Sequence, residues 1–338
     1  SPPLGILSKY AQPDNERAVE FAVKCFALGY NTEKTEAEMQ IRTDLAVEAH
    51  AHLGGKVSGV TSEQEQRGDI VITRVSINNK AAAKCMGKEM GRYITLDMPF
   101  IANQSPEQLT ETARVTADEL KNIAGEAHKI LIIGLGNRRM TPDSLGPKTL
   151  ESVLVTRHIK RELPDFLSES AAEICAFAPG VLGVTGIETA EMVRGVVDEV
   201  RPDLIIAIDS LASRMTSRIG ASVQISDAGI SPGSGMGNRR KSLNSASLGA
   251  KVIAIGVPMV TYAATIAGDL LESALGSSAD EAENILLMKR VLRQRGGDLV
   301  VTPKEIDTLS DKTARQLALA IDMAFGNEED IDILRQLV

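Results

Sequence analysis

Asp143 and Asp209 are the residues whose types and placement most strongly indicate chemistry. The aliphatic segment 129–133 (KILII) leads to Asp143 through a glycine- and proline-containing stretch, and 204–208 (LIIAI) leads directly to Asp209. Short aliphatic runs bounded by turn signals are typical of buried parallel strands. Because the working site of an open α/β sheet lies beyond the carboxyl ends of its strands, we expect both acids to meet at one end of one sheet.

The two aspartates admit three interpretations. Two carboxyl groups in contact share a proton, so that one can act as a base on water while the other acts as an acid. Carboxyl groups set farther apart could instead hold a divalent metal ion through their oxygens. Each residue could also be a helix or turn cap, because Asp is a common N-cap. The capping interpretation weakens for the pair, since both acids follow strands of one sheet.

A glycine-rich stretch at 229–237 is followed by three consecutive cations, Arg239, Arg240 and Lys241. Such a loop could present backbone N–H groups to a phosphate or to an extended peptide. It could also be a flexible connection with a solvated basic end. We favour a functional loop, with the three cations as substrate contacts, because long ordered loops in compact domains usually carry function.

The segment GLGN at 134–137 lacks the third glycine of a dinucleotide-binding motif, so nucleotide binding is disfavoured. Its glycines allow a tight turn and close backbone approach. We expect the Asn137 side-chain amide to brace this loop, and Asn137 to be a possible substrate contact. The four histidines form no motif for a catalytic triad or a zinc site.

The overall composition narrows the class of protein. A net charge of −8 over 338 residues argues against a general nucleic-acid binder. Three scattered cysteines, Cys25, Cys85 and Cys175, favour reduced thiols in a cytoplasmic setting. The sequence has no apolar run long enough to span a membrane and no basic-then-apolar secretory signal near its first residues.

Alternation of strand and helix patterns predicts an α/β fold with a mostly parallel sheet covered on both faces. A half-exposed strand at 69–77, with 92–98 as its partner, predicts a smaller antiparallel element. Ser105 and Gln108 form a capping pattern that opens a helix over 105–127. The further expected strands are 129–134, 174–177, 203–208, 222–226 and 252–257, and the further expected helices are 15–28, 148–162, 186–200, 260–275 and most of 280–325.

Longer motifs extend from residue 41 to about residue 305. They comprise IRTDLAVEA (41–49), GKEMGRYITLD (87–97), GLGN and TPDSLGPK within 134–148, APGVLGVTGIETAE (178–191), PDLIIAIDSLASR (202–214), QISDAGISPGSGMGNRRK (224–241) and VIAIGVP (252–258). Together these motifs resemble the germination protease family of endospore-forming bacteria. The stretch before residue 41 is not part of the resemblance.

The resemblance implies an endopeptidase that cleaves small acid-soluble spore proteins during germination, in the cytoplasm of the spore. It implies an atypical aspartic peptidase with Asp143 and Asp209 as the catalytic pair, no cofactor and no metal, and a fold similar to hydrogenase maturation peptidases. In those peptidases the equivalent acids bind a metal, so a metal-dependent peptidase with the same two aspartates stays as the alternative. A non-catalytic protein that binds spore proteins is a more distant alternative.

The resemblance also implies a self-processing zymogen that assembles as a homotetramer. Its processing site places the scissile bond between Asp44 and Leu45, which makes 1–44 an N-terminal extension and propeptide. Residues 45–338 then form a single α/β peptidase domain, with the antiparallel subregion near 69–98. Neither a nucleic acid nor a membrane is expected as a partner.

Overall fold

The aliphatic runs of the sequence form the inner strands of a large sheet. This computed structural model describes residues 43–231, 242–267, 270, 299–327, 330–331 and 333–334. The chain divides into two compact units, 1–41 and 42–338, and every described residue belongs to the second unit. The helix predicted at 15–28 therefore lies outside the described residues.

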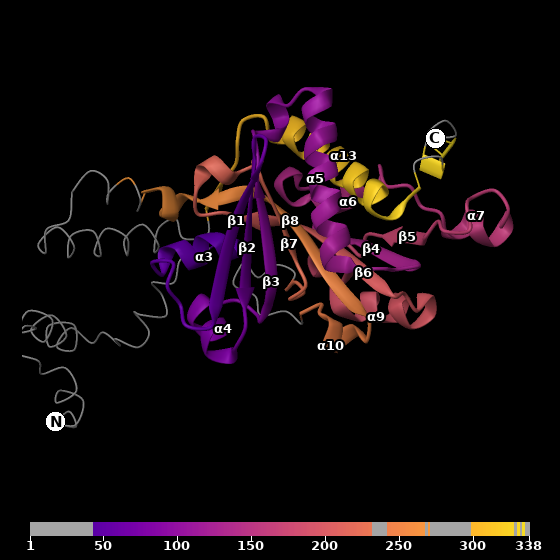
Figure 1. The fold of residues 1–338 in the computed structure, drawn as a ribbon, viewed down its shortest axis with the longest axis horizontal. Coiled ribbons are helices and arrows are strands. Elements are labelled where there is room, and N and C mark those ends of the chain that lie inside the picture. The colour runs from indigo at the N-terminus through magenta and orange to yellow at the C-terminus, as the bar shows by residue number, and fades with distance from the viewer. Residues whose placement is uncertain are drawn as a thin grey trace, which may run out of the picture. The chain divides into compact units, whose positions relative to one another are not determined.

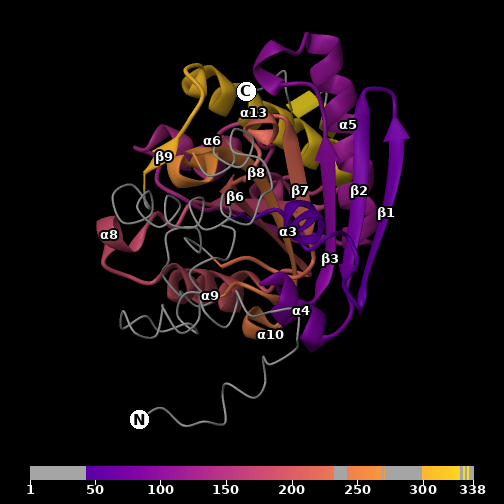
Figure 2. The same cartoon turned by 90° about the vertical axis from the view of Figure 1, so that its left-hand side faces the viewer.

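Within the described residues the sheet has nine strands, in the order β1-β2-β3-β7-β8-β6-β4-β5, and β9 pairs with β8 (Figures 1 and 2). The parallel part holds β4 (Lys129–Gly134), β5 (Glu173–Phe177), β6 (Leu204–Ala212) and β8 (Lys251–Tyr262). The antiparallel part holds β1 (Val60–Arg67), β2 (Ile70–Ile77), β3 (Gly91–Asp97), β7 (Ser222–Ser226) and β9 (Val300–Val301). The predicted α/β class is confirmed, and the antiparallel strands continue the parallel sheet.

Helices cover both faces of this sheet. One face carries α5 (Pro106–Ala124), α6 (Leu145–Leu150) and α13 (Ile306–Phe325), with α5 and α13 packed side by side (Figure 1). The other face carries α3 (Ala46–His52), α4 (Lys80–Met86), α9 (Thr189–Val200) and α10 (Ser245–Leu248). Residues of β6 alternate accordingly: Ile206 and Ile208 join the first core, and Ile205 and Ala207 join the second.

Several predicted elements are confirmed, including the antiparallel pairing of β2 with β3 and the capping box of Ser105 and Gln108 that opens α5. The helix predicted at 148–162 is wrong in its extent, because α6 ends at Leu150 and α7 (Arg157–Glu162) begins after a break. Thr156 causes the break: its hydroxyl donates to the Ala172 carbonyl and accepts from the Ile174 N–H, which draws the chain onto β5.

Other predicted boundaries are wrong because a strand or turn overrides the local pattern. The helix expected at 260–275 begins late, since β8 continues to Tyr262 and helical residues start at 263. The helix expected at 186–200 is α9, which begins late at Thr189, because Gly186 adopts a left-handed conformation with φ of 70° and ends the short helix α8 (Leu182–Thr185) before it. Residues 280–298 lie outside the described residues.

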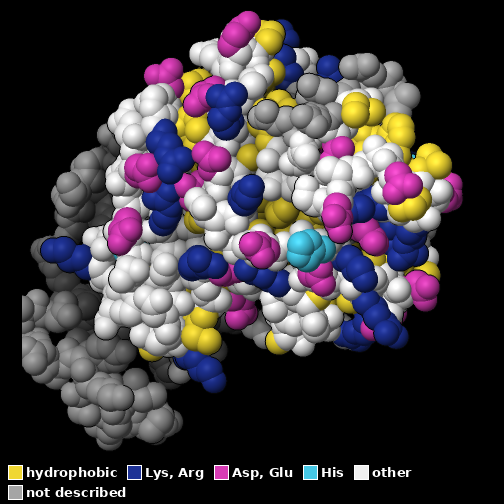
Figure 3. All heavy atoms as spheres, turned by 45° about the vertical axis from the view of Figure 1, so that its right-hand side comes forward, with side chains coloured by type: hydrophobic (Ala, Val, Ile, Leu, Met, Phe, Trp, Pro, Cys, Tyr) yellow, Lys and Arg dark blue, Asp and Glu magenta, His cyan; other side chains and the backbone are white. Residues whose placement is uncertain are grey.

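The surface is consistent with the acidic composition. Figure 3 shows lysine and arginine side chains interspersed with aspartate and glutamate, so the described residues on that face form no continuous basic patch. Among the described residues, no helix combines the length and apolar character that a bilayer crossing requires.

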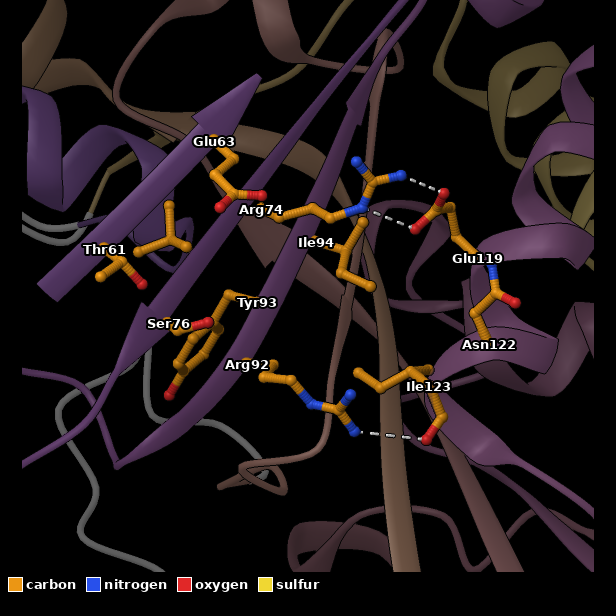
Figure 4. Close-up of a pocket in the computed structure, with 11 residues that line it drawn as sticks. Thr61, Glu63, Arg74, Ser76, Arg92, Tyr93, Ile94, Glu119, Asn122 and Ile123 are labelled. Atoms are coloured by element: carbon orange, nitrogen blue, oxygen red, sulfur yellow. Dashed lines mark hydrogen bonds and ion pairs between the residues drawn. The ribbon is translucent and has the colours of Figure 1, made fainter. Parts of the chain in front are cut away.

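A buried ion pair joins the antiparallel strands to the helical layer. Arg74 of β2 donates to the Glu119 carboxylate of α5 through Nε, at 3.1 Å, and through a second guanidinium nitrogen (Figure 4). The Glu119 side chain is only 2% exposed, whereas that of Arg74 is 31% exposed. Arg92 and Ile123 line the same small hollow of about 240 Å³. The pair therefore fixes α5 against β2 at the edge of the helical layer.

We predict that Glu119→Gln lowers the free energy of unfolding by about 2 kcal/mol, because Arg74 loses its buried charged partner and keeps the more exposed Glu65 carboxylate, at 2.8 Å. Glu111→Gln is the matched control on the same helix. Glu111 pairs with Arg114 at 2.9 Å, but both side chains are 60% exposed, so the loss should stay below about 0.5 kcal/mol. Urea unfolding of both variants measures the difference; equal losses would contradict the prediction.

Candidate active site

Asp209 lies inside strand β6, whereas the sequence analysis expected it in a loop beyond the strand. In the register of the sheet, Asp209 is opposite Gly256 of β8, and Gly256 is opposite Gln224 of β7. Residues directly opposite each other project to the same face, so the Asp209 and Gln224 side chains share the face that carries α3 and α9. The alternative in which Asp209 caps a turn is therefore wrong.

Asp143 reaches the same end of the sheet from a short 3-10 turn, η3 (Thr141–Asp143). Its carboxylate accepts a hydrogen bond from the Asn137 backbone N–H at 2.8 Å. Gly136 permits this closure: its φ is +105°, and a Cβ there would come within 2.1 Å of the Asp143 carbonyl oxygen. The bracing role predicted for Asn137 is confirmed, because its Oδ1 accepts from the Arg139 N–H at 3.0 Å.

The environment of the two carboxyl groups differs. Asp209 is 8% exposed, and burial is the main cause that raises its pKa well above the usual value. The nearby charges of Asp143 and, to a smaller extent, Asp44 also raise the Asp209 pKa, while the Ser210 N–H, at 2.8 Å, opposes the rise. Asp143 is half-buried. Asp209 therefore keeps a proton more readily than an aspartate in water does.

A cleft of about 760 Å³ holds both carboxyl groups. The β4–η3 loop contributes Asn137 and Asp143, and β6 contributes Asp209. The opposite wall comes from α4, β3 and β7, and from the start of the glycine-rich stretch. The further lining residues on that wall include Ala83, Lys84, Lys88, Tyr93, Gln224, Ser226, Gly229 and Ile230.

The segment that contains the Asp44–Leu45 bond lies along this cleft. The Asp44 N–H donates to the Ala212 carbonyl at 2.8 Å, and the Asp44 carboxylate accepts from the Ala212 N–H, also at 2.8 Å. Gln224 bonds on both sides of Leu45: its Nε2 donates to the Asp44 carbonyl at 3.2 Å, and its Oε1 accepts from the Ala46 N–H at 2.8 Å. Residues 44–46 therefore cross from β6 to β7 over the sheet face.

Glu48 anchors the next turn of this segment. Its buried carboxylate accepts from the Arg214 and Met215 N–H groups, at 2.7 and 3.0 Å, and from the Thr43 hydroxyl. Lys88 donates to the Thr43 carbonyl at 2.8 Å. Burial lowers the pKa of the Lys88 ammonium, although the Asp44 and Glu48 charges act in the opposite direction.

The predicted substrate contacts Arg239, Arg240 and Lys241 lie outside the described residues. Within the described ranges, no group of three or more His, Cys, Asp or Glu side chains could hold a metal ion. A divalent cation held by Asp143 and Asp209 would take most of its ligands from water. The sequence analysis missed Gln224 and Lys88; the one available signal was a polar residue, Gln224, between two apolar residues of a buried strand.

Comparison with known proteins supplies independent information. The family model described as germination protease matches residues 36–283. A germination protease of Clostridium perfringens is 41% identical over 84% of this chain and 94% of its own length, and that of Caldanaerobacter subterraneus is 42% identical with the same coverage. A germination protease of Bacillus cereus is 34% identical over 88% of this chain and 96% of its own length.

Among solved structures, the [NiFe] hydrogenase maturation protease HycI from Thermococcus kodakarensis matches with a TM-score of 0.31 and 16% identity. The match covers 60% of this chain and 99% of that chain. So limited an overlap supports no conclusion about function.

We predict that Asp209→Asn stabilises the protein at about pH 7. An aspartate whose folded pKa is raised binds more protons in the folded state than in the unfolded state, so stability falls as pH rises above the unfolded value of 3.8 and through the folded pKa. Asparagine cannot ionise, so the variant does not lose this stability as the pH rises. Its advantage in free energy of unfolding over the parent should vanish below pH 3.8, where Asp209 is protonated in both states.

Thermal unfolding at a series of pH values measures the effect. Asp203→Asn is the control at the opposite end of β6: the Asp203 carboxylate accepts from the His128 and Lys129 N–H groups, at 3.1 and 3.0 Å, so this variant should be less stable than the parent. An Asp209→Asn protein that is no more stable than the parent at neutral pH would contradict the prediction.

Proposed function

This chain belongs to the germination protease family, whose members are endopeptidases of spore germination, and from that premise we propose that it cleaves small acid-soluble spore proteins with Asp143 and Asp209 as its catalytic pair. The observation that carries the proposal is the meeting of these two carboxyl groups in one cleft, where burial and mutual repulsion raise the pKa of Asp209.

In the proposed mechanism the two acids take different roles. Asp209, which retains its proton, donates a hydrogen bond to the scissile carbonyl oxygen, and ionised Asp143 accepts a proton from a water molecule. The water oxygen forms a bond to the carbonyl carbon while the carbonyl oxygen takes the Asp209 proton. The tetrahedral intermediate then collapses: a proton passes from Asp143 to the leaving amine, the C–N bond breaks, and a hydroxyl group of the intermediate returns its proton to Asp209 as the product carboxyl group forms.

We further propose that the chain is a zymogen with residues 1–44 as an N-terminal extension and propeptide. The support is the position of the Asp44–Leu45 bond, which lies in the cleft between contacts to Ala212 and Gln224. In this form the segment occupies space that an external substrate would need. Residues 45–338 are then the peptidase domain.

A homotetrameric assembly and a cytoplasmic location in the spore complete the proposal, and both rest on the family resemblance alone. The contact of Arg239, Arg240 and Lys241 with acidic substrate rests on their charge and on the glycine-rich stretch before them.

We predict that Asp143→Asn and Asp209→Asn each reduce cleavage of a small acid-soluble spore protein by roughly 10³-fold, because each removes one side of the proton transfer. Intact-mass analysis at mildly acidic pH, with and without a chelator, measures cleavage. Asp203→Asn should stay active, since it lies at the other end of β6. Full activity in either variant would refute the assignment of Asp143 and Asp209 as the catalytic pair. Loss of activity of the parent protein on addition of chelator would favour the metal-dependent alternative.

We predict that Asp44→Ala slows release of residues 1–44 by roughly tenfold, because alanine loses the charged hydrogen bond to the Ala212 N–H that holds the segment in the cleft. Intact mass followed over time gives the rate and the position of the cut. Release at an unchanged rate and at the same bond would argue against this assignment. Asp69→Ala, a change at an exposed turn, is the control.

A further inference from the structure

We propose that Gln224 supplies the N–H group that holds the scissile carbonyl oxygen of a bound substrate. This inference rests on the proposed function, because it takes the Asp44–Leu45 bond as the maturation site and Asp143 and Asp209 as the catalytic pair. It adds a third polar residue to the reaction, drawn from the antiparallel part of the sheet.

The position of Gln224 supports this role. Gln224, Gly256 and Asp209 form one row across three neighbouring strands, with the side chains of Gln224 and Asp209 on the same face. Strands lie about 4.8 Å apart, so the two backbones are roughly 10 Å apart. Gly256 carries no side chain, and Leu211 occupies the space above it, because a Cβ at 256 would lie 2.5 Å from the Leu211 side chain. The amide and the carboxyl group therefore face one cleft across an apolar floor.

Of the two hydrogen bonds that Gln224 makes to residues 44–46, one would remain after the proposed cut and the other would be lost. Its Oε1 accepts from the Ala46 N–H, and Ala46 stays with the chain after a cut between Asp44 and Leu45. That bond keeps the amide oriented with Nε2 toward the cleft. The acceptor of Nε2 is the Asp44 carbonyl, which is the carbonyl of the bond to be cut and which leaves with the propeptide.

In the intact chain Gln224 is only 7% exposed, and the departure of Asp44 removes the acceptor of its Nε2. An N–H group that faces the cleft without a protein acceptor is available to a carbonyl oxygen at this point. A substrate whose scissile carbonyl takes the place of the Asp44 carbonyl satisfies that donor. As the water attacks, electron density grows on the same oxygen before its proton transfer from Asp209 is complete. The Gln224 hydrogen bond therefore strengthens in the transition state, and its contribution falls mainly in kcat.

Two variants test the proposal in the full chain. Gln224→Met removes both hydrogen bonds at similar length, and Gln224→Glu keeps the acceptor for the Ala46 N–H while removing the donor. Thr95→Val is the matched control: Thr95 is opposite Gln224 in the same row and 1% exposed, but it does not line the cleft. The measurements are the rate of self-release of residues 1–44, kcat and KM for a small acid-soluble spore protein, and the melting temperature.

We expect kcat and the self-release rate to fall roughly a hundredfold to a thousandfold in both Gln224 variants, the range for loss of one such donor, with KM changed less than about threefold. Thr95→Val should keep its kcat, and a cooperative melting transition in each Gln224 variant will show that the variant is folded. A kcat within about twofold of the parent in Gln224→Glu, or an equal loss in Thr95→Val, would overturn the proposal.

The same assay distinguishes a failure of the Gln224 role from a failure of the catalytic pair. Inactive Asp143→Asn and Asp209→Asn proteins beside an active Gln224→Glu protein would overturn the role of Gln224 and leave the catalytic pair standing. Active Asp143→Asn or Asp209→Asn protein would overturn the catalytic pair itself, whatever the Gln224 variants do.

Discussion

The burial of the Asp209 carboxyl group beside a second carboxyl group is the constraint on which the site depends. Removing a carboxylate from water costs free energy, and a neighbouring negative charge adds to the cost, so the pKa of Asp209 is raised in the folded protein. The strand that imposes this burial is itself stabilised by aliphatic contacts on both faces, with Ile206 and Ile208 on one side and Ile205 and Ala207 on the other. The free energy gained by packing these aliphatic side chains thus offsets the cost of burying the Asp209 carboxyl group.

The sequence predicted the features that depend on local pattern. Aliphatic runs identified β4, β6 and β8, and a capping pattern identified the start of α5. It failed where contacts distant in the chain decide the outcome. Thr156 divides a predicted helix because it bonds to β5, and β1 was missed because its residues are mostly exposed and polar. The extension of β6 through Asp209 follows from its pairing with β8, which no local pattern records.

In the candidate site, too, residues marked by a local pattern could be predicted, and residues placed by strand register could not. Asp143 and Asp209 could be chosen from the sequence because each follows an aliphatic run. Gln224 could not be joined to them, because its place depends on the register of three strands and on a segment 180 residues earlier in the chain. The segment 44–46 also links the two parts of the sheet, since α3 packs on β2 and β3 while Asp44 is bonded to β6.

The position of Glu48 has a consequence for the chain after processing. Leu45 is the N-cap of α3 and Glu48 is the third residue of that helix, so a cut after Asp44 would begin the helix with an α-ammonium group. The amino end of a helix is the positive end of its dipole, where an added positive charge is disfavoured. The Glu48 carboxylate, already directed toward this end through the Thr43 hydroxyl, would face that charge once Thr43 has left. The helix therefore holds a negative charge at the end where the proposed cut would place a new α-ammonium group.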